Sequence, residues 1–245
     1  MSSHSKTALV TGAAGAIGAS IARALAGLGA RVLLVDIAAA PIEALADEIP
    51  GSVPVVLDLS DTDAVAARID ALSAEFGGID ILVNNAGILS NNKAATTTIE
   101  EWRRVTAVNV DAAFVLSRGV LPSMRAKRWG RIVNISSYAA KSGGLTAGTA
   151  YSVSKASLIG LTFSIARETA SEGITVNAIA PAYVMSRMIS EQLTEAQRQQ
   201  QLAQIPVGRF CEPEEVAHAV TFLVSPLAGF ITGEVVDMNG GLHFD

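Results

Sequence analysis

The chain has 245 residues, 50% of them hydrophobic, 17% charged and 5% aromatic, which is enough for one large core and excludes intrinsic disorder. With 18 Lys and Arg against 23 Asp and Glu, the formal net charge is −5 at pH 7, which argues against a protein that binds nucleic-acid phosphates. The single cysteine, Cys211, excludes a disulfide framework and a cysteine-based zinc cluster.

The apolar stretches and the N-terminal segment both predict a location inside the cell. The most hydrophobic stretches are interrupted by Arg31, Asp36, Asp80 or Asn84, so we expect no membrane span. The segment Met1–Lys6 is polar and leads directly into strand-like residues, unlike a signal peptide. We therefore predict a cytoplasmic protein with neither a membrane nor a nucleic acid as partner.

Short β-branched segments alternate with longer alanine-rich amphipathic ones along the whole chain. In chain order, the segments typical of strands buried on both faces are Thr7–Thr11, Arg31–Asp36, Val53–Leu57, Ile79–Asn84, Arg131–Ser136, Ile174–Ala180 and Glu234–Met238. The helical segments include Ile17–Leu28, Asp61–Phe76, Ile99–Ala126, Ala150–Glu172 and Glu212–Leu223. This alternation predicts a seven-stranded parallel sheet with helices on both faces.

We expect a single doubly wound α/β domain over residues 1–245, with residues 1–6 as a polar N-terminal tail. No composition shift, charge block or low-complexity tract divides the chain into two domains. In doubly wound sheets, ligands bind beyond the carboxyl ends of the strands. The residues that follow each strand are therefore the candidates for function.

A glycine-rich turn follows the first strand and opens directly into a helix. Residues Thr11 to Gly18 read Thr-Gly-Ala-Ala-Gly-Ala-Ile-Gly, and such small residues let the backbone approach a pyrophosphate at the helix N-terminus. Asp36 ends the second strand, where a carboxylate can accept both ribose hydroxyls of an adenosine and repel a 2′-phosphate. The sequence predicts NAD rather than NADP as cofactor. A plain strand–helix turn, and an N-cap role for Asp36, remain alternatives.

Further motifs follow in order along the chain. They are Asp58 after the third strand, Asn84-Asn85-Ala86-Gly87 after the fourth, Asn109 in a helix, Ser136-Ser137 after the fifth, Tyr151-Ser152-Val153-Ser154-Lys155, and Pro181 after the sixth. Together with the glycine turn, they resemble the short-chain dehydrogenase/reductase family over essentially the whole chain. The resemblance implies a Rossmann fold, a nicotinamide cofactor and an oxidoreductase that acts on CH–OH groups.

The chain departs from the family's usual pattern at two positions. Ala16 stands where the glycine turn usually has its middle glycine, and Ala182 replaces the glycine of a Pro-Gly turn after the sixth strand. We expect cofactor binding to survive, because Gly15 precedes Ala16 and alanine adds only a methyl group. Ser186 keeps the hydroxyl that the family uses to meet the nicotinamide carboxamide.

The resemblance implies four catalytic residues, namely Asn109, Ser137, Tyr151 and Lys155. Tyr151 and Lys155 lie four residues apart on a predicted helix and therefore share one face. A neighbouring ammonium and an oxidised nicotinamide lower the pKa of a phenol, so Tyr151 is expected to exchange a proton with the substrate. By resemblance, Lys155 also holds the nicotinamide ribose, Ser137 rather than Ser136 binds the reacting oxygen, and Asn109 holds a water on a proton path. Taken singly, each residue also has an ordinary structural interpretation.

The family pattern also implies a set of cofactor-binding positions near the strand ends. These are Gly12, Gly15, Ile17, Gly18, Asp36, Asp58, Leu59, Asn85, Ala86, Gly87, Tyr151, Lys155, Pro181, Val184 and Ser186. An N-cap role for Asp58 is an alternative. His4, His218 and His243 lie away from these positions, and no metal site is predicted.

The substrate loops of the family correspond to Ile88–Ala94, Tyr138–Thr149 and Tyr183–Pro206, with a substrate loop or lid at about residues 186–206. Their mixed polar and apolar side chains favour a small polar hydroxy or keto substrate, such as a sugar, polyol or hydroxy acid. Our first hypothesis is therefore an NAD-dependent dehydrogenase of a secondary alcohol.

Two other hypotheses remain open. A 3-oxoacyl-(acyl-carrier-protein) reductase would dock an acidic carrier through basic residues, for which the candidates are Arg125, Lys127, Arg128 and Arg131; Asp36 and Glu172 count against it. A catalytically inactive scaffold is opposed by the intact catalytic residues.

The resemblance also implies a homo-oligomer, a tetramer or dimer, in which the small residues Ala156, Gly160 and Ser164 allow two helices to approach closely. The alternative is that these residues pack on the protein's own sheet.

Overall fold

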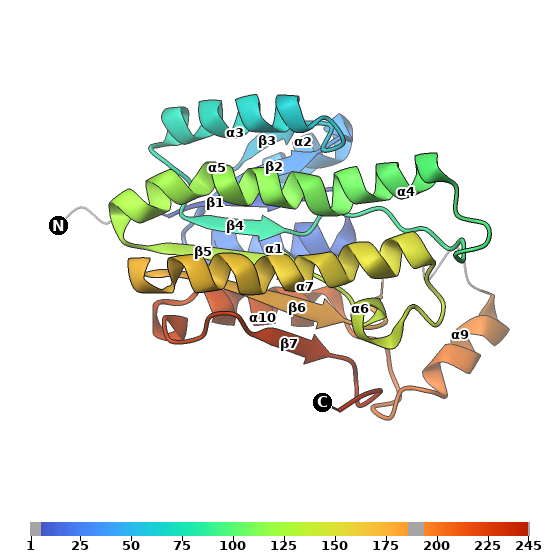
Figure 1. Cartoon of the computed structure of the whole chain (residues 1–245). Coiled ribbons are helices and arrows are strands. Elements are labelled where there is room, and N and C mark those ends of the chain that lie inside the picture. The colour runs from blue at the N-terminus through green and yellow to red at the C-terminus, as the bar shows by residue number, and fades with distance from the viewer. Residues whose placement is uncertain (1–5, 186–193, 245) are drawn as a thin grey trace.

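The computed structural model describes residues 6–185 and 194–244, and within them seven strands form one parallel sheet (Figure 1). The strands are β1 (Thr7–Thr11), β2 (Arg31–Asp36), β3 (Val53–Val56), β4 (Ile81–Asn84), β5 (Gly130–Ile135), β6 (Ile174–Pro181) and β7 (Val235–Met238). Their order is β3-β2-β1-β4-β5-β6-β7, and all neighbouring pairs run parallel. The chain changes direction across the sheet between β1 and β4, where such folds open a ligand crevice. The predicted fold class is confirmed.

Helices cover both faces of the sheet. One face carries α1 (Ala16–Gly27), α2 (Ala39–Glu48) and α10 (Pro213–Val224), and the other carries α3 (Thr62–Phe76), α5 (Ala112–Lys127) and α7 (Thr149–Thr169). Figure 1 shows α3, α5 and α7 in front of the sheet, with α1 and α10 behind it. The other helical segments are α4 (Ile99–Thr106), the π-helix η1 (Ala107–Asp111), α6 (Ala139–Ser142), α9 (Glu195–Leu202) and the 3-10 turns η2 (Ala170–Glu172) and η3 (Pro226–Ala228).

The strands supply two cores, one on each side of the sheet. Val10 of β1 packs in the same core as Ile21 of α1, whereas the adjacent Leu9 packs with Ile69 of α3, and all four side chains are buried. Because both faces are covered, the strands need apolar residues at successive positions. This explains why they read as continuous apolar runs.

Two helical assignments differ from those that the sequence predicts. Helix α2 was not among the helical segments named from the sequence. Its third residue is Pro41, and a proline is tolerated in a first helical turn, where backbone N–H groups have no helical partner. The helix predicted over Ile99–Ala126 contains the π-helical segment Ala107–Asp111. A single widened turn leaves no clear mark on hydrophobic periodicity.

By length and composition alone, the helical segment Ile99–Lys127 could cross a membrane, contrary to the expectation that no segment would; its most apolar 18-residue window has a mean hydropathy of 1.2. The expectation failed because charged residues of the strands were taken as interruptions, while this helix carries few charges in its most apolar window. Half of that window is buried inside the protein, and core helices of globular proteins pass the same test.

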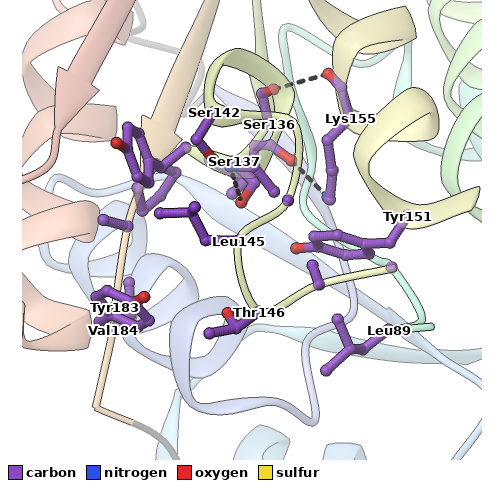
Figure 2. Close-up of a pocket in the computed structure, with 18 of the residues that line it drawn as sticks. Leu89, Ser136, Ser137, Ser142, Leu145, Thr146, Tyr151, Lys155, Tyr183 and Val184 are labelled. Atoms are coloured by element: carbon purple, nitrogen blue, oxygen red, sulfur yellow. Dashed lines mark hydrogen bonds between the residues drawn. The ribbon is translucent and has the colours of Figure 1, made fainter. Parts of the chain in front are cut away.

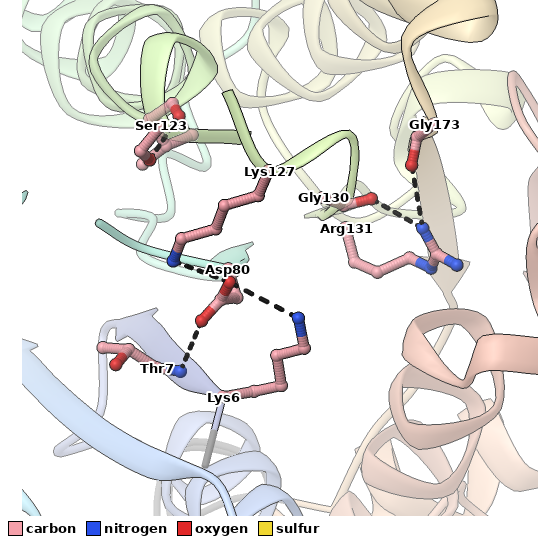
Figure 3. A network of polar contacts seen from close by, with 9 residues as sticks. Lys6, Thr7, Asp80, Ser123, Lys127, Gly130, Arg131 and Gly173 are labelled. Carbon is pink, nitrogen blue, oxygen red and sulfur yellow. Dashed lines mark hydrogen bonds and ion pairs between the residues drawn. The ribbon is translucent and has the colours of Figure 1, made fainter. Parts of the chain in front are cut away.

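Charged side chains pair with one another at the edge of the sheet where the strands begin (Figure 3). The carboxylate of Asp80, only 6% exposed, accepts hydrogen bonds from the backbone N–H of Thr7 and the ammonium of Lys127, each at 2.9 Å. The ammonium of Lys6 lies 3.6 Å from the same carboxylate. This amino edge of the sheet therefore joins β1, β4 and α5 through one buried acid.

Candidate active site

The glycine turn after β1 is built so tightly that two of its positions admit only glycine. Gly12 has a φ of +66°, and a Cβ there would lie 2.9 Å from the Cα of Ala86. A Cβ on Gly18 would lie 2.1 Å from the carbonyl oxygen of Gly12. The third predicted glycine, Gly15, is less constrained and serves as the N-cap of α1.

The N-terminus of α1 faces the carboxyl edge of the sheet without a side-chain cap. Gly15 has no side chain to accept from the first N–H groups of the helix, and Ala16 is its exposed first residue. The methyl group of Ala16 thus causes no crowding within the protein. The nearby Ile17 is partly buried and lines the cavity described below.

The end of β4 is held against the glycine turn by Asn85. Its side-chain amide donates to the carbonyl oxygens of Thr11 (2.9 Å) and Gly12 (3.2 Å). The hydroxyl of Thr11 in turn accepts from the backbone N–H groups of Asn85 and Ala86, each at 3.0 Å. Asn85 therefore shapes the turn, and Thr11 is a contributor that the sequence did not single out.

Asp36 is bound to backbone on both of its carboxylate oxygens. One oxygen accepts from the N–H of Ala14 at 3.0 Å, and the other accepts from the N–H of Ala38 at 3.1 Å. The first of these bonds spans 22 residues and fixes the glycine turn to the end of β2. The carboxylate thus supports the turn as well as bordering it.

The residues after β3 lie at the same edge. Asp58 is exposed, and its carboxylate accepts from the backbone N–H and the hydroxyl of Ser60, which lowers the pKa of the acid. Leu59 is buried. The alternative role of Asp58 as the N-cap of the next helix is wrong, because Asp61 accepts from the first N–H groups of α3.

Ser137, Tyr151 and Lys155 come together at the carboxyl ends of β5 and β6 (Figure 2). The hydroxyl of Ser137 hydrogen-bonds the Tyr151 phenol, whereas Ser136 donates to the carbonyl oxygen of Lys155 at 2.8 Å. This favours the choice of Ser137 over Ser136. The ammonium of Lys155 lies 5.7 Å from the centre of the Tyr151 ring and donates to the carbonyl oxygen of Ile135 at 2.7 Å.

Burial changes the acidity of both titrating groups. Lys155 is 4% exposed, and the loss of solvation lowers the pKa of its ammonium to about 8. Burial raises the pKa of the Tyr151 phenol, and the Ser137 hydrogen bond opposes this only in part. The protein by itself therefore favours a protonated phenol, which differs from the lowered pKa expected for Tyr151 with a cofactor present.

Asn109 lies in the π-helix η1 and is almost completely buried. Its side-chain oxygen accepts from the N–H of Ile88 at 2.8 Å, and its amide donates to the carbonyl of Ile88 at 3.1 Å. The amide also donates to the hydroxyl of Ser154 at 3.0 Å, which itself donates to the carbonyl of Tyr151. Asn109 thus joins the loop after β4 to α7. Ser154 was missed, although its place inside the Tyr-x-x-x-Lys motif pointed to it.

A cavity of about 430 Å³ opens beside these residues. Its walls include Asn85, Gly87, Ser137, Tyr151, Lys155, Pro181 and Val184 of the predicted site, together with Leu89, Asn91, Ser142, Leu145, Thr146, Tyr183 and Gln201. Gln201 of α9 was not predicted as a site residue. Ser186 lies outside the described residues, as does the first part of the predicted lid over 186–206.

The residues present fit a dinucleotide. The glycine turn offers backbone without side chains beside an uncapped helix N-terminus, which suits a pyrophosphate. At Gly87, a Cβ would lie 3.2 Å from the Lys155 ammonium, so the missing side chain leaves the lysine accessible from the cavity. Among the described residues, no three His, Cys, Asp or Glu side chains are grouped as a metal ion would need.

The doubly wound sheet, the glycine turn and the Ser137, Tyr151 and Lys155 cluster define a class of protein, the oxidoreductases that use a dinucleotide. The chain matches, over residues 12–243, the family model described as enoyl-(acyl carrier protein) reductase. It is 42% identical to 3-oxoacyl-(acyl-carrier-protein) reductase FabG of Vibrio cholerae and 40% identical to that of Escherichia coli, over 245 residues and 99% of each chain. The chain belongs to the short-chain dehydrogenase/reductase family and is an oxidoreductase that acts on CH–OH groups.

A solved structure is also similar to this one. It is a putative NAD(P)-dependent gluconate 5-dehydrogenase from Beutenbergia cavernae with NADP bound at low occupancy. The two chains are 40% identical and superpose with a TM-score of 0.90, covering 97% of this chain and 96% of the other.

The predicted preference for NAD over NADP is wrong. The similar dehydrogenase structure holds NADP. The prediction rested on the Asp36 carboxylate as a ribose acceptor, and the structure shows that this carboxylate also accepts the backbone N–H groups of Ala14 and Ala38. Because these contacts are made through folding, the type and position of Asp36 in the sequence did not reveal them.

Proposed function

We propose that the protein is an NADPH-dependent 3-oxoacyl-(acyl-carrier-protein) reductase that works in the cytoplasm. The observation that carries this proposal is the 40–42% identity, over 99% of both chains, to reductases of that name. Relatives of this similarity favour the acyl substrate over the sugar, polyol or hydroxy acid of our first hypothesis. Under both hypotheses, the protein is an oxidoreductase that acts on a CH–OH group.

The catalytic roles are assigned to the residues that line the cavity. NADPH, when bound, supplies the hydride for the C3 carbonyl of the substrate. The Tyr151 phenol gives its proton to the carbonyl oxygen, and the Ser137 hydroxyl holds that oxygen in place. Lys155 supplies positive charge beside the phenol and a donor for the cofactor ribose. Asn109 fixes the loop after β4 against the catalytic helix.

The cofactor is assigned to the carboxyl edge of β1 to β4 and β6. The α1 N-terminus would hold its pyrophosphate, and Tyr151 and Lys155 would hold its nicotinamide end. The residues assigned to it are Gly12, Gly15, Ile17, Gly18, Asp58, Leu59, Asn85, Ala86, Gly87, Tyr151, Lys155, Pro181 and Val184. Asp36 acts through its bonds to the glycine turn.

The acidity of Tyr151 is compatible with its assigned role as proton donor. A phenol whose pKa is raised by burial keeps its proton at neutral pH and can donate it to a carbonyl oxygen.

The basic residues suggested for carrier docking do not border the cavity of their own chain. Arg125 hydrogen-bonds Glu168 at 2.6 Å and Glu172 at 2.8 Å, and Lys127 binds Asp80 at the amino edge. Arg131 is 3% exposed. A docking surface for the carrier is therefore not assigned to these residues of a single chain.

We also propose that the protein forms a homo-oligomer through α7. Ala156, Gly160 and Ser164 are exposed on this helix, and a Cβ on Gly160 would meet open space. The alternative that they pack on the protein's own sheet is wrong. Phe163 of the same helix and Phe114 of α5 are half exposed, so association would bury apolar surface. Light scattering of the purified protein measures the mass of the assembly directly.

The function is tested by comparing substrates at equal enzyme concentration. We expect acetoacetyl-(acyl-carrier protein) to be reduced with NADPH, with a higher kcat/KM than with NADH and than gluconate oxidation with NADP. Gluconate turnover without any reduction of the acyl substrate would overturn the proposal. Preference for NADH would overturn its cofactor assignment.

A further inference from the structure

The segment Gly143–Ala147 forms one side of the cavity. Four of its residues line the cavity, and Figure 2 shows Leu145 and Thr146 among the side chains around it, as it does Tyr151. The segment is irregular, and it begins with Gly143 and Gly144 at φ values of +71° and +75°. Glycines at positive φ restrict the chain little, so such a segment keeps one shape only where other parts of the protein bind it.

Lys93 provides that binding from another loop. Its ammonium donates to the carbonyl oxygen of Gly144 at 2.6 Å and to that of Ala147 at 2.7 Å. The two carbonyls lie at either end of the stretch that carries Leu145 and Thr146. Hydrogen bonds from a charged donor are stronger than those between neutral groups, so one side chain fixes both ends of this stretch.

The loop that carries Lys93 is itself well supported. Its carbonyl oxygen accepts from the backbone N–H groups of Thr96 (2.9 Å) and Thr97 (3.0 Å), which form a turn before α4. The side chain of the preceding Asn92 donates to Glu101 of α4 at 2.8 Å. Lys93 therefore extends from a fixed base toward a segment that lacks regular structure.

The two loops also meet through their backbones at Gly148. Its N–H donates to the carbonyl of Ser90 at 2.7 Å, and a Cβ on Gly148 would lie 2.4 Å from the carbonyl oxygen of Asn92. This contact fixes only the end of the segment next to α7. The part that carries Leu145 lies between the two carbonyls bound by Lys93.

We propose that Lys93 is a positioning residue that holds Gly144–Ala147 closed over the cavity and thereby limits the length of acyl chain that the enzyme accepts. It acts through the segment and does not touch the reacting atoms. The identification of the substrate as an acyl chain rests on the proposed function, whereas the role of Lys93 in holding the segment does not.

The first test compares Lys93→Met with Lys93→Arg and with Arg103→Met, which removes a cation from the exposed surface of the neighbouring helix α4. Loss of a charged hydrogen-bond donor should raise KM for acetoacetyl-(acyl-carrier protein) about tenfold with little change in kcat. The ratio of kcat/KM for a 3-oxooctanoyl substrate over acetoacetyl should rise. Lys93→Arg should restore most of both values, and Arg103→Met should match the wild type. An unchanged KM and chain-length ratio in Lys93→Met would overturn the proposal.

The second test does not depend on any substrate. Hydrogen exchange of the amides in residues 143–148 should be faster in Lys93→Met than in the wild type, and close to wild type in Lys93→Arg and Arg103→Met. Equal exchange in all four proteins would overturn the role of Lys93 even if acyl reduction is confirmed. If exchange is faster in Lys93→Met but the wild type reduces no acyl substrate, the role of Lys93 in holding the segment stands and only the proposed function is wrong.

Discussion

The two edges of the sheet differ in whether a buried charged side chain has a partner of opposite charge. At the amino edge, Asp80 is matched by Lys127 and Lys6 and by the backbone N–H of Thr7 (Figure 3). At the carboxyl edge, Lys155 is buried beside Tyr151 with a carbonyl oxygen, that of Ile135, as the hydrogen-bond acceptor of its ammonium.

This difference separates stability from function. A buried acid with cationic and backbone partners stabilises the fold, and its loss leaves those partners unsatisfied. A buried ammonium without a carboxylate is costly to the folded state, as its lowered pKa shows, and it remains able to interact with a ligand. Substitutions at the two edges should therefore affect turnover and stability in opposite ways.

The largest effect is expected at the phenol. Tyr151→Phe removes the proton donor and should lower kcat by about 10³-fold, within the range usual for general acid catalysis. NADPH binding, measured by the change in its fluorescence, should stay close to wild type because the ring and its packing remain. Turnover close to that of the wild type would show that another group supplies the proton.

Lys155→Met should reduce turnover and stabilise the fold at the same time. We expect kcat/KM to fall about 10²-fold and the unfolding midpoint at pH 7 to rise by roughly 2–4 °C, because a buried charge is removed. The pKa of Lys155 is about 8 in the folded protein against 10.5 for an ordinary lysine, so between these values the unfolded chain binds the extra proton. The free energy of unfolding of the wild type should therefore increase relative to that of the variant as pH rises from 8 to 10.5. A lower midpoint in the variant at pH 7 would contradict this account.

A smaller effect is expected at Asp36. Asp36→Ala removes both hydrogen bonds to Ala14 and Ala38, so kcat/KM should fall about tenfold with NADPH and with NADH alike. Asp61→Ala, at the N-cap of α3, is a control that removes an acid away from the glycine turn. A change in the ratio between the two cofactors, rather than a common loss, would show that the carboxylate selects between them.

Asp80→Ala tests the amino edge of the sheet and should leave kcat unchanged. The buried N–H of Thr7 loses its acceptor and Lys127 its partner, at a cost of about 1–3 kcal/mol, or roughly 2–4 °C in the unfolding midpoint per kcal/mol. Thermal unfolding and kcat are measured on the same preparation. Reduced kcat with an unchanged midpoint would reverse the roles assigned to the two edges.

The sequence predicted those parts of the molecule that depend on local pattern. The parallel sheet followed from the alternation of strands and helices, and the shared face of Tyr151 and Lys155 followed from their spacing on α7. The π-helical turn around Asn109 could not be foreseen, since one extra residue in a turn leaves apolar periodicity almost unchanged.

Contacts between segments far apart in the chain also could not be predicted from the sequence. The bonds from Ala14 to Asp36 and from Lys93 to Gly144 join residues that are 22 and 51 positions apart. Neither partner has a sequence pattern that reveals the other. For this reason, the sequence predicted neither the support that Asp36 gives to the glycine turn nor the contact of Lys93 with Gly144.

Reduction of a 3-oxoacyl group with a proton from Tyr151 can be observed in a single turnover. The protein is mixed with NADPH and one equivalent of acetoacetyl-(acyl-carrier protein), and the carrier is analysed by mass spectrometry. We expect a product heavier by two hydrogens in the wild type and none in Tyr151→Phe. An unchanged carrier mass in the wild type, with NADPH remaining reduced, would contradict this expectation.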